Sequence, residues 1–159
     1  MLRKLGPWLM FVAALFVMSL GIALVTRGNL GTTPISSLPL VSSYASSLTF
    51  GETTFLINLL FVAAQWVLLR RSINKVLLLA QIPITLAFSY FIDTSMKFTE
   101  FLSSDVYWKC LAVSMLGNMV LGLGVALEVF SGAAALPGEG LVLAVSTVPV
   151  SYTHLRAHE

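Results

Sequence analysis

Long apolar runs are the feature that most constrains what this chain can fold into. Four of them are each long enough to cross the ~30 Å hydrocarbon core of a bilayer as a helix, over residues 7–26, 53–69, 76–92 and 106–130. Of all residues, 57% are hydrophobic and only 10% are charged, whereas soluble domains carry about 25% charged residues. The sequence therefore predicts an all-α, polytopic transmembrane helix bundle surrounded by membrane lipid.

The same composition argues against several functional classes. The formal net charge of +2 is small and spread over loops, so it gives no nucleic-acid signal. The sequence contains no Gly-rich phosphate loop, no nucleophile elbow and no metal-spaced His/Cys set. We therefore expect no enzyme, no catalytic residue, no metal site and no cofactor. Cys110 is the single cysteine, which excludes an intrachain disulfide, and we interpret it as a small packing residue.

A repeat relates the two halves of the chain. The segment Leu20–Leu24, LGIAL, recurs as Leu123–Leu127, LGVAL, and at the same spacing Pro34 is matched by Pro137. Each copy contains an apolar helix, a break rich in small residues, a proline and a second, short apolar segment. The copies cover about 7–71 and, incompletely, 106–150. Paired broken helices of this kind often build a binding site at the midplane of membrane transporters.

The short segment after the first break decides the predicted topology. Residues 34–47 reach only roughly 20 Å as a helix, too short to span, but a re-entrant segment buried in protein would be tolerated. If it re-enters and the N-terminus is cytoplasmic, five basic residues lie inside, namely Arg3, Lys4, Arg70, Arg71 and Lys75. If it spans, the first two and the last three lie on opposite sides. The positive-inside rule favours the re-entrant arrangement, which makes the repeat inverted. The first run is too long for a signal peptide and lacks a cleavage site, so we expect it to be retained.

The first break has the pattern of a helix start. Thr33 is a predicted N-cap and Pro34 stands at the first helical position. Such a helix end directs backbone N–H groups and a positive dipole end forward, which suits an anion or a carboxylate-bearing solute. Thr32, Ser36 and Ser37 add hydroxyl groups, so all five residues are candidates for substrate binding. The alternative is a tight turn that only reverses the chain.

The second break adds carboxylates. Pro137, Glu139 and Gly140 are further substrate-binding candidates, and Glu139 stands where the first copy has Ser36. Glu128 stands where the first copy has Val25, on a small and polar helix face formed by Cys110, Ser114, Gly117, Leu121, Gly124 and Glu128. We expect that face to pack inside the bundle and Glu128 to be a coupling-ion site for a proton or cation. The alternative places both glutamates at an interface, in contact with headgroup water.

Other polar residues have plainer interpretations. Four amide side chains within the apolar runs are expected to join helices rather than bind a ligand, namely Asn58, Gln65, Gln81 and Asn118. Pro83 is a predicted kink. Asp93 opens a predicted polar loop, residues 93–105, and is expected to be a solvated boundary residue.

The motifs are similar to those of the YczE/YyaS/YitT family of bacterial membrane proteins. The shared features are the Gly/Ala helix, an LGTSP-like break, a T-x-G turn, an asparagine in the next span and a GAGPRDGL-like second break, carried here by Gly21–Leu24, Leu30–Pro34, Thr49–Gly51, Asn58 and Ala133–Leu141. Ser36, Gly138 and Glu139 depart from the family pattern. The resemblance implies a multi-pass protein of the bacterial cytoplasmic (inner) membrane and suggests transport.

The last nine residues differ in character from the apolar segment before them. Residues 151–159, SYTHLRAHE, resemble a translated sequencing adapter, so we expect a single transmembrane domain over 1–150, a non-native tail, and a natural protein that continues. Two functions remain as hypotheses. One is a permease for a small molecule or ion, with its site at the paired breaks and pH-dependent flux that requires Glu128 or Glu139. The other is a non-transporting accessory protein of a biosynthetic or assembly complex. A homo-oligomer is compatible with either.

Overall fold

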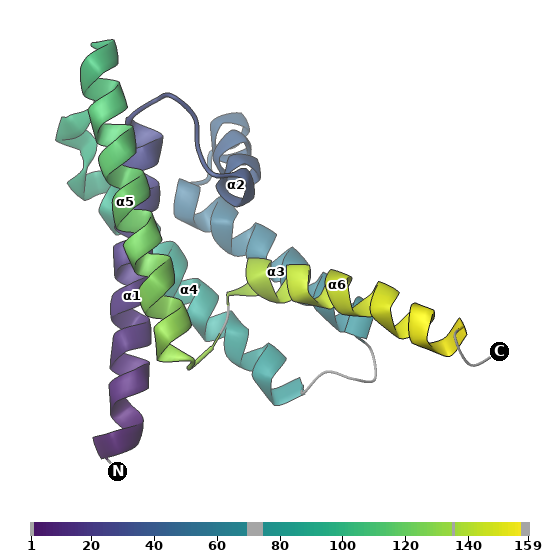
Figure 1. Cartoon of the computed structure of the whole chain (residues 1–159). Helices are drawn as coiled ribbons and strands as arrows, with labels where there is room; N and C mark the ends of the chain where they lie inside the picture. The colour runs from purple at the N-terminus through teal and green to yellow at the C-terminus, as the bar shows by residue number, and fades with distance from the viewer. Residues whose placement is uncertain (1, 70–74, 135, 157–159) are drawn as a thin grey trace.

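The described part of the chain is entirely helical outside its turns and loops. The computed structural model describes residues 2–69, 75–134 and 136–156, and over 2–5, 69, 75–77 and 147–156 it describes the backbone alone. Figure 1 shows the helices in chain order, which are α1 (Leu2–Arg27), α2 (Pro34–Ala45), α3 (Phe50–Leu69), α4 (Lys75–Phe98), the short 3-10 helix η1 (Glu100–Leu102), α5 (Tyr107–Ser131) and α6 (Pro137–Arg156). No strand occurs within these ranges. The predicted all-α class is confirmed.

Three of these helices are long and apolar enough to cross a membrane. They cover Gly6–Arg27, Phe50–Leu68 and Tyr107–Ser131, which indicates a membrane protein. A fourth predicted run, residues 76–92, is helical within α4, which continues past Pro83 but is not among these three candidates. Arg70 and Arg71, on which the predicted orientation depends, lie outside the described residues, so the cytoplasmic placement of the N-terminus stays a prediction.

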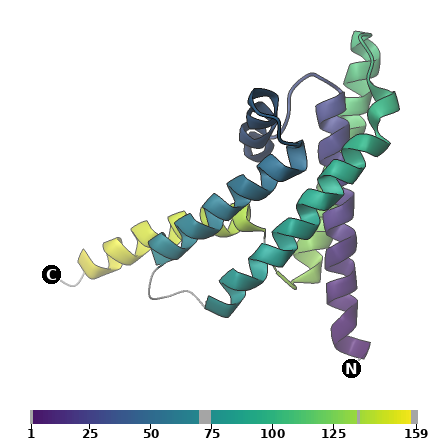
Figure 2. The same cartoon turned by 180° about the vertical axis from the view of Figure 1, so that it is seen from behind.

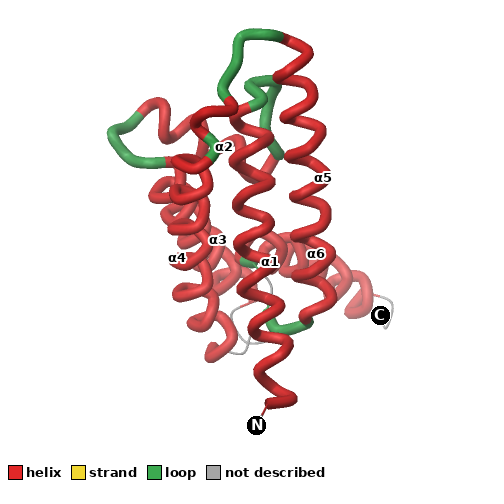
Figure 3. The backbone as a smooth tube through the Cα atoms, turned by 90° about the vertical axis from the view of Figure 1, so that its left-hand side faces the viewer, coloured by secondary structure: helices red, strands yellow, loops and turns green. Residues whose placement is uncertain are grey.

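Helices α1 and α5 lie side by side and run in opposite directions (Figures 1 and 3). Small residues bring the two backbones together: a Cβ added to Gly21 would lie 2.5 Å from the backbone N of Leu121, and one added to Gly117 would lie 2.6 Å from the backbone N of Val25. The predicted inward face of α5 is confirmed, because the buried residues of this helix are Cys110, Ser114, Gly117, Gly124, Glu128 and Ser131. Close backbone approach through small residues is typical of helices that pack within membranes.

The remaining helices extend from this pair, as the view from behind shows (Figure 2). Helix α2 lies against the beginning of α3, where Thr53 Oγ1 donates a hydrogen bond of 2.9 Å to the carbonyl of Pro39. Helix α3 contacts both α4 and α6. The buried apolar cluster that joins α1, α3, α4 and the start of α6 consists of Phe11, Leu15, Met18, Ile22, Phe50, Phe88, Ile92 and Leu136.

Asp93 is partly buried and has a more specific role than that of the predicted solvated boundary residue. Helix α4 continues to Phe98, so the first part of the expected polar loop is helical, and η1 occupies another part of it. The Asp93 carboxylate accepts hydrogen bonds from Thr49 Oγ1 at 2.6 Å and from the Gly51 N–H at 2.7 Å. A Cβ on Gly51 would collide with this carboxylate and with the Ser89 carbonyl. Asp93 therefore caps the beginning of α3, where a negative charge stabilises the helix. The T-x-G turn supplies the donors of this cap, from Thr49 and Gly51.

Candidate functional site

The first break folds as its sequence predicted. Thr33 adopts an extended conformation, with φ −68° and ψ 151°, and its Oγ1 accepts a hydrogen bond from the Ser36 N–H at 3.4 Å. Pro34 occupies the first helical position of α2. The Thr33 hydroxyl also donates to Ser36 Oγ at 2.9 Å. This capping arrangement fixes the start of α2 and holds Ser36 next to the break.

The second break is held by Glu128. Helix α5 ends at Ser131 and is followed by the capping residue Gly132, whose φ of 57° lies in the left-handed region that glycine adopts readily. The chain then turns back, and the Leu136 N–H donates a hydrogen bond of 3.3 Å to Glu128 Oε1. Helix α6 begins at the next residue, Pro137, whose carbonyl accepts a bond of 2.9 Å from Gln65 Nε2. The end of α5 and the start of α6 are thus tied to each other and to α3.

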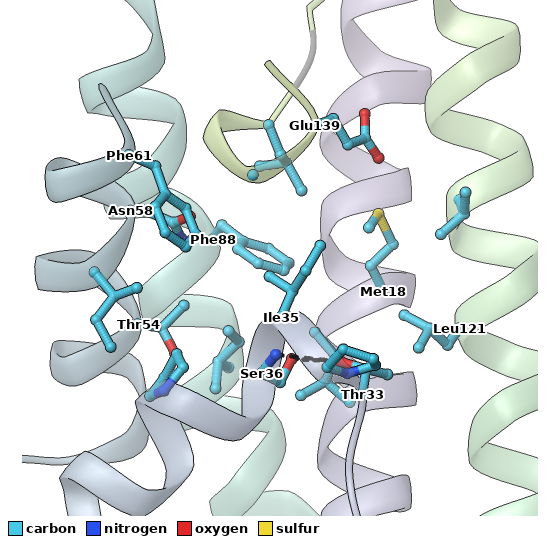
Figure 4. A pocket seen from close by; sticks show the side chains of 18 residues that line it. Met18, Thr33, Ile35, Ser36, Thr54, Asn58, Phe61, Phe88, Leu121 and Glu139 are labelled. Carbon is cyan, nitrogen blue, oxygen red and sulfur yellow. Dashed lines mark hydrogen bonds between the residues drawn. The ribbon is translucent and has the colours of Figure 1, made fainter. Parts of the chain in front are cut away.

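The two breaks meet at one cavity of about 370 Å³. Thr33, Pro34 and Ser36 line it from the first break, and Leu136 and Glu139 line it from the second. Figure 4 shows Glu139 on the side of the cavity opposite Thr33 and Ser36. The remaining wall comes from α1 to α5, with Met18, Ile22, Pro39, Thr54, Ile57, Asn58, Phe61, Phe88, Ile92, Leu121 and Val125, while Ile35 and Gly138 complete the breaks. Segments about a hundred residues apart in sequence therefore form a single site.

The cavity wall is largely apolar, with a few polar groups. Thr54 is buried and its hydroxyl donates to the Phe50 carbonyl at 2.7 Å, so that group is already engaged. Asn58 is buried on the wall, with 7% of its surface exposed. Glu139 is the one charged residue among the described residues that line the cavity. A concave, mainly apolar pocket with few polar groups is the usual form of a small-molecule site.

Glu128 stands behind this wall rather than on it. It is only 2% exposed, and its second carboxylate oxygen, Oε2, is buried without a hydrogen-bond partner. Glu139 lies close enough for the two carboxylates to interact electrostatically. The prediction that Glu128 faces the interior is confirmed. The described residues contain no group of three or more His, Cys, Asp or Glu side chains that could hold a metal ion.

Besides Glu128, four predicted substrate-binding residues do not line the cavity. Ser37 Oγ donates to the Pro34 carbonyl at 2.7 Å, which turns it back along its own helix. Thr32 Oγ1 is buried without a hydrogen-bond partner, next to the cap. Pro137 and Gly140 face α3 instead: Gln65 donates to the Pro137 carbonyl, and a Cβ on Gly140 would lie 2.6 Å from Gln65 Oε1. These two residues support the second break from outside the cavity.

The amide side chains separate into two kinds. Gln65 and Gln81 are both buried and pair at 3.4 Å between α3 and α4, while Gln65 also holds α6. Their predicted role in joining helices is confirmed. Asn118 donates a hydrogen bond to the carbonyl of Ser114 within α5, and this bond does not connect α5 to another helix. Asn58 lines the cavity. The sequence did not distinguish this position from those of the amides that join helices.

The aromatic part of the site was not predicted. Phe61 and Phe88 line the cavity from α3 and α4 (Figure 4). The sequence offered no signal for them, because phenylalanine is frequent in every apolar run and helical periodicity is weak where lipid surrounds the helices.

These observations define a helical membrane protein with a mainly apolar cavity between two helix breaks. The chain belongs to a family of unknown function, DUF6198, whose model matches residues 5–157. No curated protein and no solved structure matches the chain. The likeness to the YczE/YyaS/YitT proteins stays a prediction.

Proposed function

We propose that this protein is a permease for a small solute, which binds in the cavity between the two helix breaks. The observation that carries the proposal is the convergence of Thr33–Ser36 and Leu136–Glu139 on one cavity of about 370 Å³. Broken helices whose ends meet in this way form the substrate sites of many secondary transporters. A purely structural break would require no shared cavity.

The lining residues support an internal repeat. Ten of them form pairs that stand at the spacing of Pro34 and Pro137, and these pairs are Met18 with Leu121, Ile22 with Val125, Thr33 with Leu136, Ile35 with Gly138, and Ser36 with Glu139. Both members of each pair face the same cavity. A cavity on a local two-fold axis would have this property.

The packing of α1 against α5 supports an inverted repeat. A Cβ on Gly21 would meet Leu121, and a Cβ on Gly124 would meet Met18. Because Gly21 corresponds to Gly124 and Met18 to Leu121, each of these contacts becomes the other when the two copies are exchanged. With α1 and α5 antiparallel, the exchange is a rotation about an axis across the helices. Inverted repeats of this kind allow a site to open alternately to the two sides of a membrane.

Alternating access can be tested with a single cysteine in the cavity. We would replace Cys110 by serine, introduce Ser36→Cys, and expose membrane vesicles of either orientation to a membrane-impermeant maleimide. A permease predicts labelling from each side, because the cavity opens in turn to both. Labelling from one side only, or from neither, would contradict the proposal.

A matched control is available on α5. Val129 is 71% exposed on the outside of the described structure, so Val129→Cys is expected to face lipid and to react from neither side. The accessory-protein alternative predicts labelling of Ser36→Cys from at most one side, together with a stable partner on co-purification. The two functions therefore give different labelling patterns with the same two variants.

A further inference from the structure

We infer that the cavity selects a small amphiphilic cation, an amine with an apolar body, in preference to an anion. The inference rests on the proposed function, since it names the solute class of the same site. It differs from the expectation that the helix start at Pro34 suits an anion. Three features of the cavity carry it: the charges on and behind its wall, the backbone donors at the breaks, and its aromatic surface.

The ionisable groups on and behind the cavity wall are carboxyl groups. Glu139 is on the wall, and no lysine or arginine is among the described lining residues. Glu128 lies behind it, with one carboxylate oxygen buried and without a hydrogen-bond partner. The two carboxylates are close enough to interact with each other. When both are ionised they repel each other, and a cation bound next to Glu139 would relieve that repulsion, whereas an anion would add to it.

Some of the backbone donors that an anion would need at the two helix ends are missing or already engaged. Pro34 and Pro137 carry no N–H. The Ser36 N–H is bonded to Thr33 Oγ1, and the Leu136 N–H is bonded to Glu128 Oε1. Each helix N-terminus contributes the equivalent of about half a positive charge, so an ionised Glu139 alone offsets both ends. Whenever Glu128 is ionised, negative charge predominates.

The rest of the wall suits an apolar body. Ile57, Phe61 and Phe88 line the cavity with aliphatic and aromatic surface. An aromatic ring also attracts a cation that lies over its face. An amine whose charge pairs with Glu139 could therefore place its apolar part against the apolar side chains of α3 and α4.

The test compares three probes of similar shape on the protein in lipid nanodiscs: 2-phenylethylammonium, 2-phenylethanol and 3-phenylpropanoate. Calorimetric titration should give a Kd for the amine about tenfold or more below that of the alcohol, which corresponds to about 1.4 kcal/mol, with the carboxylate the weakest. In Glu139→Gln the preference for the amine should be lost while binding of the alcohol is retained. Retained alcohol binding also shows that the variant is folded.

The control is Glu100→Gln, which makes the same change of charge at an exposed residue of η1 that does not line the cavity. It should leave all three affinities unchanged. Tightest binding by the carboxylate, or an amine preference that survives Glu139→Gln, would overturn the inference.

The labelling test separates this outcome from failure of the proposed function. Two-sided labelling of Ser36→Cys that is slowed by the alcohol or the carboxylate, but not by the amine, would support the permease function and refute the preference for a cation. One-sided labelling combined with amine binding that depends on Glu139 would support the cation-binding site and refute the permease function.

Discussion

Replacement of Gly21 by alanine probes a close approach of the α1 and α5 backbones. A Cβ at this position would lie 2.5 Å from the backbone N of Leu121 and 2.7 Å from its Cα. Ordinary contacts of a Cβ begin near 3.4 Å, so the two helices would have to separate locally by about 1 Å. Because the obstructing atoms include backbone, a change of side-chain rotamer cannot make the space.

The expected loss of stability follows from two opposing effects. A gap of about 1 Å forfeits roughly a quarter to a half of the dispersion attraction between the facing atoms, and overpacking of a tight interface costs about 1–3 kcal/mol. Alanine in place of glycine within a helix returns about 0.5–1 kcal/mol. We therefore expect Gly21→Ala to lower the free energy of unfolding by about 1–2 kcal/mol.

Gly122→Ala on α5 is the matched control. A Cβ on Gly122 has no other heavy atom within 4 Å, so only the gain in helix propensity applies. Unfolding in mixed micelles, followed by loss of helical circular dichroism, should rank the variants Gly122→Ala, wild type and Gly21→Ala in order of decreasing stability. The reasoning would be refuted if Gly21→Ala were as stable as Gly122→Ala.

A double variant makes the test more specific. A Cβ on Gly124 would lie 2.7 Å from the backbone N of Met18, on the same interface. Once Gly21→Ala has separated the helices, Gly124→Ala should add less than it does alone, because neighbouring substitutions that share a backbone shift are not additive. Full additivity would show that the two contacts yield independently.

Three further predictions concern buried or capping hydrogen bonds, each measured by the same unfolding assay. Asp93→Asn should lower the free energy of unfolding by about 1 kcal/mol, because an amide has only one oxygen to accept the hydrogen bonds from Thr49 Oγ1 and the Gly51 N–H. An unchanged stability would show that Asp93 does not cap α3. Glu128→Leu should cost about 1–3 kcal/mol by leaving the Leu136 N–H unpaired, whereas Glu128→Gln should keep that hydrogen bond and most of the stability. Equal losses in the two variants would show that this bond does not stabilise the second break. Gln65→Leu should cost about 1 kcal/mol and speed amide exchange at the start of α6 more than in α5; uniform exchange would show that Gln65 does not anchor α6.

Several features of the fold could be predicted because they depend on neighbours along the chain. The apolar runs form helices, since a helix satisfies its backbone hydrogen bonds within the segment. The start of α2 was evident from Thr33 and Pro34, because capping involves residues only three apart. The buried face of α5 followed from small residues at helical spacing.

The role of Asp93 could not be predicted in this way. Its partner Thr49 is 44 residues away, and nothing near Asp93 in the sequence indicates that α4 would bring it to the start of α3. The convergence of the two breaks is of the same kind. It depends on the antiparallel packing of α1 and α5, which the backbone contacts of Gly21 and Gly117 allow.

The sequence by itself determined that this protein is helical, apolar enough for a membrane, and interrupted before Pro34 and before Pro137. Only the tertiary structure decided that Ser36 and Glu139 face one cavity, that Phe61 and Phe88 complete it, and that Pro137 faces α3 instead. The physical reason is the range of the interactions involved. Helix formation and capping are set within about one turn of the chain, whereas a cavity exists only where helices from distant parts of the sequence meet and leave space between their side chains.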